Sequence, residues 1–291
     1  MAAQHAGDGG GGRKFQRVSD ELRTRITDGT YPLSSFLPSE RDLAEEFEVS
    51  RDTVQRALRE LASENWIASR QGSGWRVART QRIHSPTPRA TRSSRGVTLG
   101  PLISEAFERP EVTLDVYTLT SESLDAHIRL QVERIRGGFI RPERIALRML
   151  LPSEGLRLPY PRVKDDPADE RPRARLVAIS RRHTDSLRGL VKDLSTEELV
   201  RSVDVQIRHV PLVPAFKLYL LNGTEALHGM YDVIERQMEL DTGEVITALD
   251  VLGLGATLTH HVTDADPNAP GSVFVAGMQS WFDSVWDKLA E

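Results

Sequence analysis

The segment from Leu37 to Val77 constrains the fold of this chain more than any other stretch. It predicts a short helix, a tight turn at Glu48-Val49, and a second helix with Ser50 as its N-cap. Two short strands around a Gly-Ser-Gly tip follow. This order of elements places a polar helix N-terminus beside a hairpin, a geometry that fits a DNA groove.

The second predicted helix has two different faces. One face carries apolar residues at helical spacing, namely Val54, Ala57, Leu58 and Leu61. The opposite face of its first turns is polar and carries Ser50, Arg51, Asp52, Thr53 and Gln55. Such side chains at a helix N-terminus can bond both phosphates and base edges. An ordinary capped, solvated helix is the alternative interpretation of this helix taken alone.

The flanking sequence favours the DNA-binding interpretation. Upstream, apolar spacing predicts a helix from Lys14 to Asp28 that stops at Gly29. Downstream, residues 66–68 and 75–77 are typical of the two strands of a hairpin. Residues 65–104 hold seven arginines and no Asp or Glu. A run of one sign that begins inside such a hairpin indicates a phosphate-binding footprint.

These motifs resemble the winged helix-turn-helix of the GntR family of bacterial transcription regulators. The family pattern consists of a Tyr-Pro turn, LPSER-x-LA, SR-x-TV, AL-x-L and a G-x-G wing. The matching positions are Tyr31-Pro32, Leu37 to Arg41, Leu43-Ala44, Ser50-Arg51, Thr53-Val54, Ala57-Leu58, Leu61 and Gly72 to Gly74. The resemblance covers residues 14–78 and implies an α+β winged helix-turn-helix domain.

The resemblance also implies which residues contact DNA. On the two helices they are Arg41, Ser50, Arg51, Thr53 and Gln55. On the wing they are Arg70, Gln71, Gly72 and Ser73, with Gly72 at the tip entering the minor groove. Three positions depart from the family pattern. Ser34 and Asn65 stand at usual glycine positions, and Gln55 replaces a frequent arginine, so the base preference is expected to differ.

Charge divides the chain into two parts. Residues 1–96 hold 16 basic and 12 acidic side chains, a net of +4, whereas the remainder holds 22 and 30, a net of −8. The acidic part is not expected to touch DNA, because its field opposes the phosphates. The predicted organisation is disorder over 1–13, the winged domain over 14–78, a Pro- and Arg-containing linker over 79–96, and an effector-sensing, dimerising domain over 97–291.

Several kinds of site are disfavoured by what the sequence lacks. Zero cysteines remove disulfides, thiol catalysis and cysteine-based metal sites. No stretch reaches the ~20 apolar residues that span a bilayer, so a cytoplasmic, nucleoid-associated protein without membrane contact is expected. His260 and His261 are adjacent and face opposite ways on a strand, and His209 and His228 are interpreted as structural. We therefore expect no metal and no cofactor.

Beyond the linker, strands alternate with helices, which predicts an α/β domain. The predicted strands are 112–118, 144–151, 203–210 and 216–221, with a further apolar stretch at 245–254. The predicted helices are 124–135, 179–199 in two pieces, and 273–290, with a loop over 152–173 and a helical or turn segment at 224–231. The last helix carries Trp281 and Trp286, which are either a dimer surface or core residues.

The stretch from Val203 to Gly223 weakly resembles a strand region of the phospholipase D superfamily, whose signature is His-x-Lys, four residues, then Asp. The corresponding positions here are Ala215, Lys217 and Asn222. That chemistry needs the histidine as a nucleophile on phosphorus. The resemblance therefore implies a catalytically dead site with one phosphate-compatible cation, and makes Lys217 and Asn222 candidate ligand residues. A solvated lysine and a chorismate-lyase-like domain are the alternatives.

Together these observations predict a DNA-binding transcription regulator and not an enzyme. We expect a homodimer on a palindromic operator, acting as a ligand-responsive repressor. Lys217 favours a phosphate-containing small molecule as its effector. The alternatives are a DNA-tethered phosphodiesterase or nuclease, and a ligand-independent scaffold that recruits a protein partner.

Overall fold

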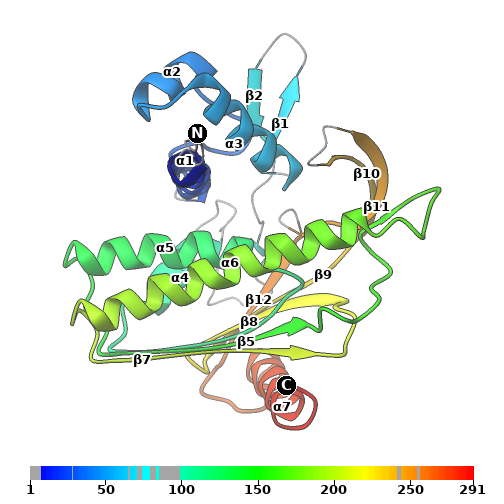
Figure 1. Ribbon diagram of the computed structural model, residues 1–291. Helices are drawn as coiled ribbons and strands as arrows, with labels where there is room; N and C mark the ends of the chain where they lie inside the picture. The colour runs from blue at the N-terminus through cyan, green and yellow to red at the C-terminus, as the bar shows by residue number, and fades with distance from the viewer. Residues whose placement is uncertain are drawn as a thin grey trace, which may run out of the picture. The chain divides into compact units, whose positions relative to one another are not determined.

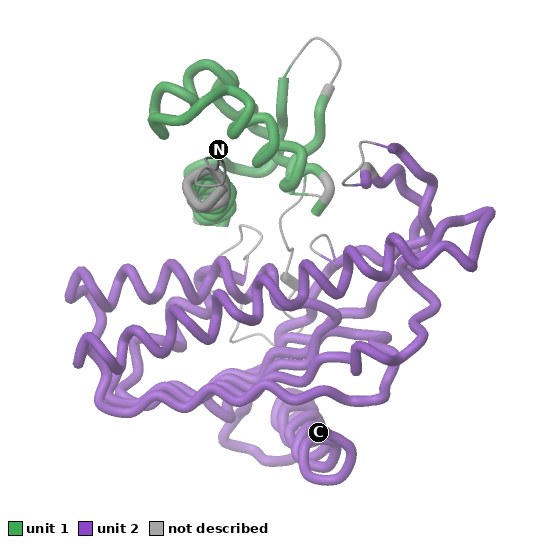
Figure 2. Tube along the Cα trace, viewed as in Figure 1, with its two compact units in different colours: residues 1–80 green, residues 81–291 purple. Residues whose placement is uncertain are grey.

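The computed structural model describes residues 8–27, 29–64, 66–70, 74–78, 83–84, 99–240, 244–253 and 256–291. The chain forms two compact units, residues 1–80 and 81–291, drawn in different colours in Figure 2. The predicted end of the winged domain at residue 78 falls near this division, and most of the predicted linker over 79–96 lies outside the described residues.

Unit 1 contains three helices and a hairpin. They are α1 (Asp8–Thr27), α2 (Glu40–Glu46), α3 (Arg51–Ser63), β1 (Ile67–Arg70) and β2 (Gly74–Val77), with β1 antiparallel to β2. The apolar stripes of the helices meet in one core, where Leu22, Leu43, Val54 and Leu58 are fully buried. Helix α1 begins at Asp8, so the prediction of disorder over 1–13 is wrong for residues 8–13. Residues 1–7 lie outside the described residues.

A buried ionic cluster joins α1 to α3. Arg23 is 1% exposed and donates Nε and Nη2 to Glu64 Oε2 at 3.0 and 2.8 Å. Its Nη2 also donates to Glu60 Oε1 at 2.6 Å, and Nη1 to Asp20 Oδ1 at 3.0 Å. Three carboxylates thus surround one guanidinium inside the small core that holds the helix-turn-helix. A buried charge is tolerated only when it is paired in this way.

Unit 2 contains a seven-stranded mixed sheet in the order β3-β12-β9-β8-β4-β5-β7 (Figure 1). Strands β4, β5 and β7 run parallel to one another, and β4, β8, β9 and β12 are successively antiparallel. The bounds are β3 (Ile83–His84), β4 (Glu111–Tyr117), β5 (Arg144–Pro152), β7 (Ser202–Val210), β8 (Phe216–Leu221), β9 (Glu225–Met230) and β12 (Leu258–Val262). A separate three-stranded sheet is formed by β10 (Val233–Glu239), β11 (Val245–Val251) and β6 (Arg162–Val163).

Helices cover both faces of the large sheet (Figure 1). Helices α4 (Leu99–Ala106), α5 (Glu122–Arg136) and α6 (Arg171–Thr196) pack on one face over the main apolar core. Helix α7 (Pro270–Lys288) packs on the other, where Phe282 is fully buried and Trp286 is 5% exposed. Trp281 lies 5.1 Å from the Tyr117 ring. Trp286 is therefore a core residue and Trp281 is partly buried against the same core, which favours the interpretation of both as core residues over a dimer surface.

The structure differs from the sequence prediction at several elements. Helix α6 is continuous, because its buried residues keep one stripe through the whole length. The segment 224–231, predicted as helical or a turn, is strand β9, and β10 and β12 were not predicted. Strand β3 lies inside the predicted linker and pairs in parallel with β12.

The strand β9 has a local signal that the sequence prediction overlooked. Leu221 O accepts from Thr224 N at 3.0 Å across a turn in which φ is +51° at Asn222 and +64° at Gly223. An Asn-Gly pair with both φ values positive is typical of the tight turn of a β-hairpin. The Asn-Gly pair after strand β8 thus indicates that the chain turns back as a second strand.

Candidate nucleic-acid interface

The N-terminus of α3 is polar and exposed, as predicted. Ser50 Oγ accepts from Thr53 N at 3.2 Å and lies 2.9 Å from Thr53 Oγ1. Arg51 and Gln55 are exposed on the surface of the same turns, whereas Val54 between them is fully buried. Because the core holds Val54, the neighbouring polar side chains are held on the outer face. This arrangement leaves a capped, positively polarised helix end in contact with solvent.

Two further residues complete the helical part of the surface. Arg41 on α2 has a 74% exposed side chain whose Nε lies 3.6 Å from Asp42 Oδ1. Gln55 Nε2 donates to Glu40 Oε2 at 2.8 Å, and Trp75 Nε1 of β2 donates to Glu40 Oε1 at 3.4 Å. Glu40 therefore connects the recognition helix with the hairpin. Sequence reasoning missed this residue, since nothing in the spacing places positions 40, 55 and 75 together.

The wing is described only in part. The backbone of Arg70 pairs with Gly74 at the end of the hairpin, and Gly74 has φ of +82°. Gln71, Gly72 and Ser73 lie outside the described residues, so their predicted contacts stay predictions. Arg76 is exposed and its Nε donates to Ser34 O at 2.6 Å. Ser34 itself has φ of +72°, which explains why glycine is usual at that position.

Three helices and a two-stranded wing of this kind define a winged helix-turn-helix, a class of DNA-binding domain. Residues 14–77 match the model of the family described as "Bacterial regulatory proteins, gntR family". The N-terminal domain is therefore a GntR-type winged helix-turn-helix, in agreement with the sequence prediction.

Several bacterial transcription regulators are similar to part of this chain. The chain is 37% identical over 83 residues to an HTH-type transcriptional regulator of Rhizobium meliloti (strain 1021), covering 28% of this chain and 34% of that protein. It is 38% identical over 72 residues to the Exu regulon transcriptional regulator of Escherichia coli (strain K12), covering 25% of this chain and 28% of that protein. A solved GntR family transcriptional regulator from Listeria monocytogenes is 33% identical and covers 22% of this chain and 56% of that chain, with a TM-score of 0.22.

The chain thus spans about a third or less of the length of these curated relatives. None of the helices that the structure describes is long and apolar enough to cross a membrane.

Lys217, the first candidate ligand residue in unit 2, is buried at the start of β8. Its side chain is 4% exposed, and Nζ donates to Gly253 O at 2.8 Å and lies 5.4 Å from the centre of the Tyr231 ring. Burial lowers the pKa of the Lys217 ammonium to about 8, and the charge of Glu122 acts in the opposite direction. The alternative interpretation of a solvated lysine is therefore wrong.

Asn222, the second candidate, serves the hairpin turn and does not join Lys217. Its Oδ1 accepts from Thr113 N at 2.8 Å, and its Nδ2 donates to Ala106 O at 3.1 Å. The two residues stand at opposite ends of β8, which at ~3.3 Å per residue separates them by roughly 16 Å. The structure thus corrects the prediction that Asn222 binds the same ligand as Lys217.

Other polar residues surround Lys217 at the carboxyl end of β4. Tyr231 OH accepts from Leu119 N at 2.9 Å and lies 3.1 Å from Thr118 Oγ1. Burial raises the pKa of the Tyr231 hydroxyl far above its usual range. Ser121, at the N-terminus of α5, is fully buried and has no hydrogen-bond partner for Oγ among the described residues. The place where parallel strands end and a helix begins is where ligands bind in open α/β sheets.

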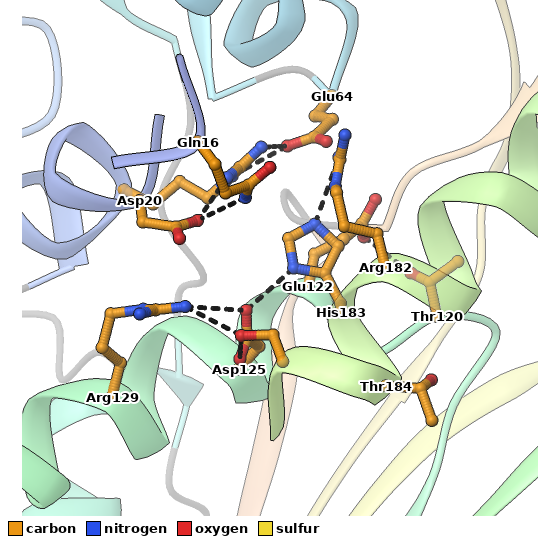
Figure 3. Close-up of polar contacts among 12 residues, drawn as sticks. Gln16, Asp20, Glu64, Thr120, Glu122, Asp125, Arg129, Arg182, His183 and Thr184 are labelled. Atoms are coloured by element: carbon orange, nitrogen blue, oxygen red, sulfur yellow. Dashed lines mark hydrogen bonds and ion pairs between the residues drawn. The ribbon is translucent and has the colours of Figure 1, made fainter. Parts of the chain in front are cut away.

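A second buried polar network lies between α5 and α6 (Figure 3). Asp125 is 2% exposed; its Oδ2 lies 2.9 Å from His183 Nδ1, and its Oδ1 accepts from Ser186 Oγ at 2.9 Å. Arg129 Nη2 lies 3.8 Å from Asp125 Oδ2. Asp125 of α5 thus contacts His183 and Ser186 of α6, and Arg129 one turn further along α5. The network therefore holds α5 against α6.

Of the histidines considered for a metal, His228 and His261 both lie against Phe274, whereas His209 stands apart. His209 on β7 and His228 on β9 are separated by strands β8, β4 and β5. His260 Nε2 lies 2.7 Å from Glu225 Oε2, while His261 stacks on Phe274 with ring centres 3.8 Å apart. Within the described part of the chain, no group of three His, Cys, Asp or Glu side chains could hold a metal ion.

Proposed function

We propose that this protein is a ligand-responsive transcription repressor that binds a palindromic operator as a homodimer. The observation that carries the proposal is the exposed polar N-terminus of α3, capped by Ser50 and bordered by Arg41 and Arg51. In this arrangement the helix end enters the major groove and the tip of the wing enters the adjacent minor groove. The two winged domains of a dimer would bind half-sites about one helical turn of DNA apart. DNase footprinting across the protein's own gene neighbourhood tests the proposal, and a protected palindrome is the expected result.

The same proposal assigns unit 2 to ligand sensing. Lys217, Tyr231 and the N-terminus of α5 supply a buried cation, a hydroxyl and the positive end of a helix, which suit a phosphate-containing ligand. A ligand there can act only through different affinities for the DNA-competent and incompetent states of the dimer. A thermal-shift screen with phosphate-containing and sugar metabolites should find a ligand that stabilises the chain.

We also propose that unit 2 is a degenerate phospholipase D-like domain without catalytic activity. Ala215 stands where that chemistry needs a histidine, and alanine cannot form a phosphoryl-enzyme bond. The expected result is no hydrolysis of a chromogenic phosphodiester by the purified protein at any pH between 5 and 9. Turnover that survives in a Lys217→Met variant would come from a contaminating enzyme, whereas turnover lost with it would contradict the proposal.

Lys217→Met is expected to raise stability while it abolishes the ligand response. The pKa falls from 10.5 to about 8 on folding, which corresponds to about 3 kcal/mol of unfavourable free energy. Because the folded-state pKa is the lower one, this cost is complete below pH 8 and fades as the pH rises toward 10.5. Chemical denaturation at pH 7 and pH 10 measures the free energy of unfolding of both chains. The increase in this free energy in the variant should be larger at pH 7 than at pH 10. Lys192→Met, at an exposed lysine of α6, is the matched control.

A further inference from the structure

Two helix-to-strand turns form one end of unit 2. The turn from α5 to β5 and the turn from α6 to β7 are joined by Arg136, which donates Nε and Nη2 to the two oxygens of Glu197 at 3.0 and 2.6 Å. Where the two turns lead into their strands, Ser202 N at the start of β7 donates to Glu143 O, the residue before β5, at 3.1 Å. Between the two turns lies an open depression of about 500 Å³, lined from both sides. We call this surface, residues 137–143 and 198–201, the turn surface.

The turn surface carries balanced charges that have no ion pair within the described residues. Arg141, Glu143, Glu198 and Arg201 all line the depression and are exposed. By contrast, the nearby Arg136 and Arg134 are paired with Glu197 and Glu108. Two positive and two negative side chains sum to zero. A phosphate backbone or a small anion requires an excess of positive charge, so this composition favours a partner of equally mixed charge.

The turn from α5 to β5, which lines one side of the depression, also carries an exposed aromatic side chain. Phe139 is 80% exposed, and Leu199 on the facing turn is 39% exposed. The Phe139 ring lies against Gly137, where a Cβ would come within 2.6 Å of Cε2. A side chain at position 137 would therefore force the Phe139 ring to move. An exposed aromatic residue near a depression is typical of an interface anchor and its pocket.

We propose that the turn surface is the interface with a second copy of this chain, related by a two-fold axis. An isologous interface presents the same patch twice, so it must be complementary to itself. Two arginines, two glutamates, an aromatic side chain and a depression on one patch meet that requirement. Each Phe139 enters the depression of the other copy, and arginines of one copy face glutamates of its partner. The inference rests on the proposed homodimer and names the surface that forms it.

Charge-swapped variants test this geometry. An acidic variant carries Arg141→Glu and Arg201→Glu, and a basic variant carries Glu143→Lys and Glu198→Lys. Each variant alone repels its own copy, so sedimentation of the full chain should give monomers, with the dimer Kd raised about a hundredfold or more, which is ~2.8 kcal/mol. An equimolar mixture of the two should recover the dimer. Only a surface that pairs with itself predicts this recovery.

Phe139→Ser supplies a second test with a matched control. This substitution should also weaken the dimer, and it remains informative if a charge-swapped chain fails to fold. Val273→Ser, at a 56% exposed apolar position on α7, should leave the dimer intact. A dimer that persists in the Phe139 and acidic variants, or a mixture that stays monomeric, would overturn this interface while leaving the homodimer standing. An unaltered chain that is itself monomeric would refute both.

Discussion

Replacing Arg51 by alanine is expected to lower the affinity for operator DNA by about ten- to a hundredfold at fixed salt, or 1–3 kcal/mol. Arg51 is the first residue of α3, and its side chain is exposed beside the capped N-terminus. A guanidinium there can reach base edges and phosphates, and the helix end adds attraction for phosphate. A gel-shift titration with the footprinted operator measures the change.

The control for this prediction is Arg188→Ala. Arg188 is an exposed helical arginine of the acidic unit 2, with Asp185 as its ion-pair partner. The Arg188→Ala substitution removes one positive charge, as Arg51→Ala does, but should leave operator affinity unchanged. If Arg51 contacts a phosphate, its loss should also reduce the slope of log affinity against log salt by about one. Equal affinities for the two variants at every salt concentration would remove Arg51 from the interface.

Arg23→Ala is expected to destabilise unit 1 by about 3–5 kcal/mol, because it leaves the carboxylates of Asp20, Glu60 and Glu64 without their shared partner. Glu64 has a fully buried side chain, so water cannot replace the lost guanidinium there. Hydrogen exchange on the full chain should show faster amide exchange in α1 and α3, with little change in α5 and α6. Chemical denaturation gives the magnitude.

Two further variants separate loss of the charge pair from loss of bulk. Arg181→Ala breaks an exposed, solvent-screened pair with Glu154 in unit 2 and should leave the free energy of unfolding nearly unchanged. Arg23→Met combined with Glu60→Gln and Glu64→Gln removes the guanidinium together with the two α3-side carboxylates, leaving only the partly exposed Asp20 charged, and should recover much of the stability. A loss below about 1 kcal/mol for Arg23→Ala would show that the buried cluster does not hold α1 on α3.

Features that depend on a few consecutive residues were predictable. The caps of α2 and α3, the apolar stripe of α3 and the hairpin follow from residues within one or two turns of each other, so their patterns are visible in the sequence. The Asn222-Gly223 turn was equally local, and its signal was available but was interpreted as part of a ligand motif. Strand β12 was harder, because its neighbours β3 and β9 lie far away in the sequence.

The candidate DNA interface was likewise predictable where it depends on neighbouring residues and not where it joins distant elements. Arg51 and Gln55 were placed on the exposed face of α3 by helical periodicity, since the buried Val54 fixes the direction of its neighbours. The link from Gln55 through Glu40 to Trp75 needed the folded chain, because these three residues come from three elements. For the same reason, nothing local to Lys217 indicated that Tyr231 and Thr118 lie around it.

The sequence by itself determined the winged helix-turn-helix and its polar surface, because periodicity, helix caps and turns depend on residues that are close together in the sequence. Only the tertiary structure decided that Lys217 is buried and that Asn222 belongs to a turn. It alone brings Phe139 and Leu199 to one surface from two turns 60 residues apart. Burial and self-complementary surfaces depend on which distant elements pack together, and the pairing of strands across long separations sets that packing.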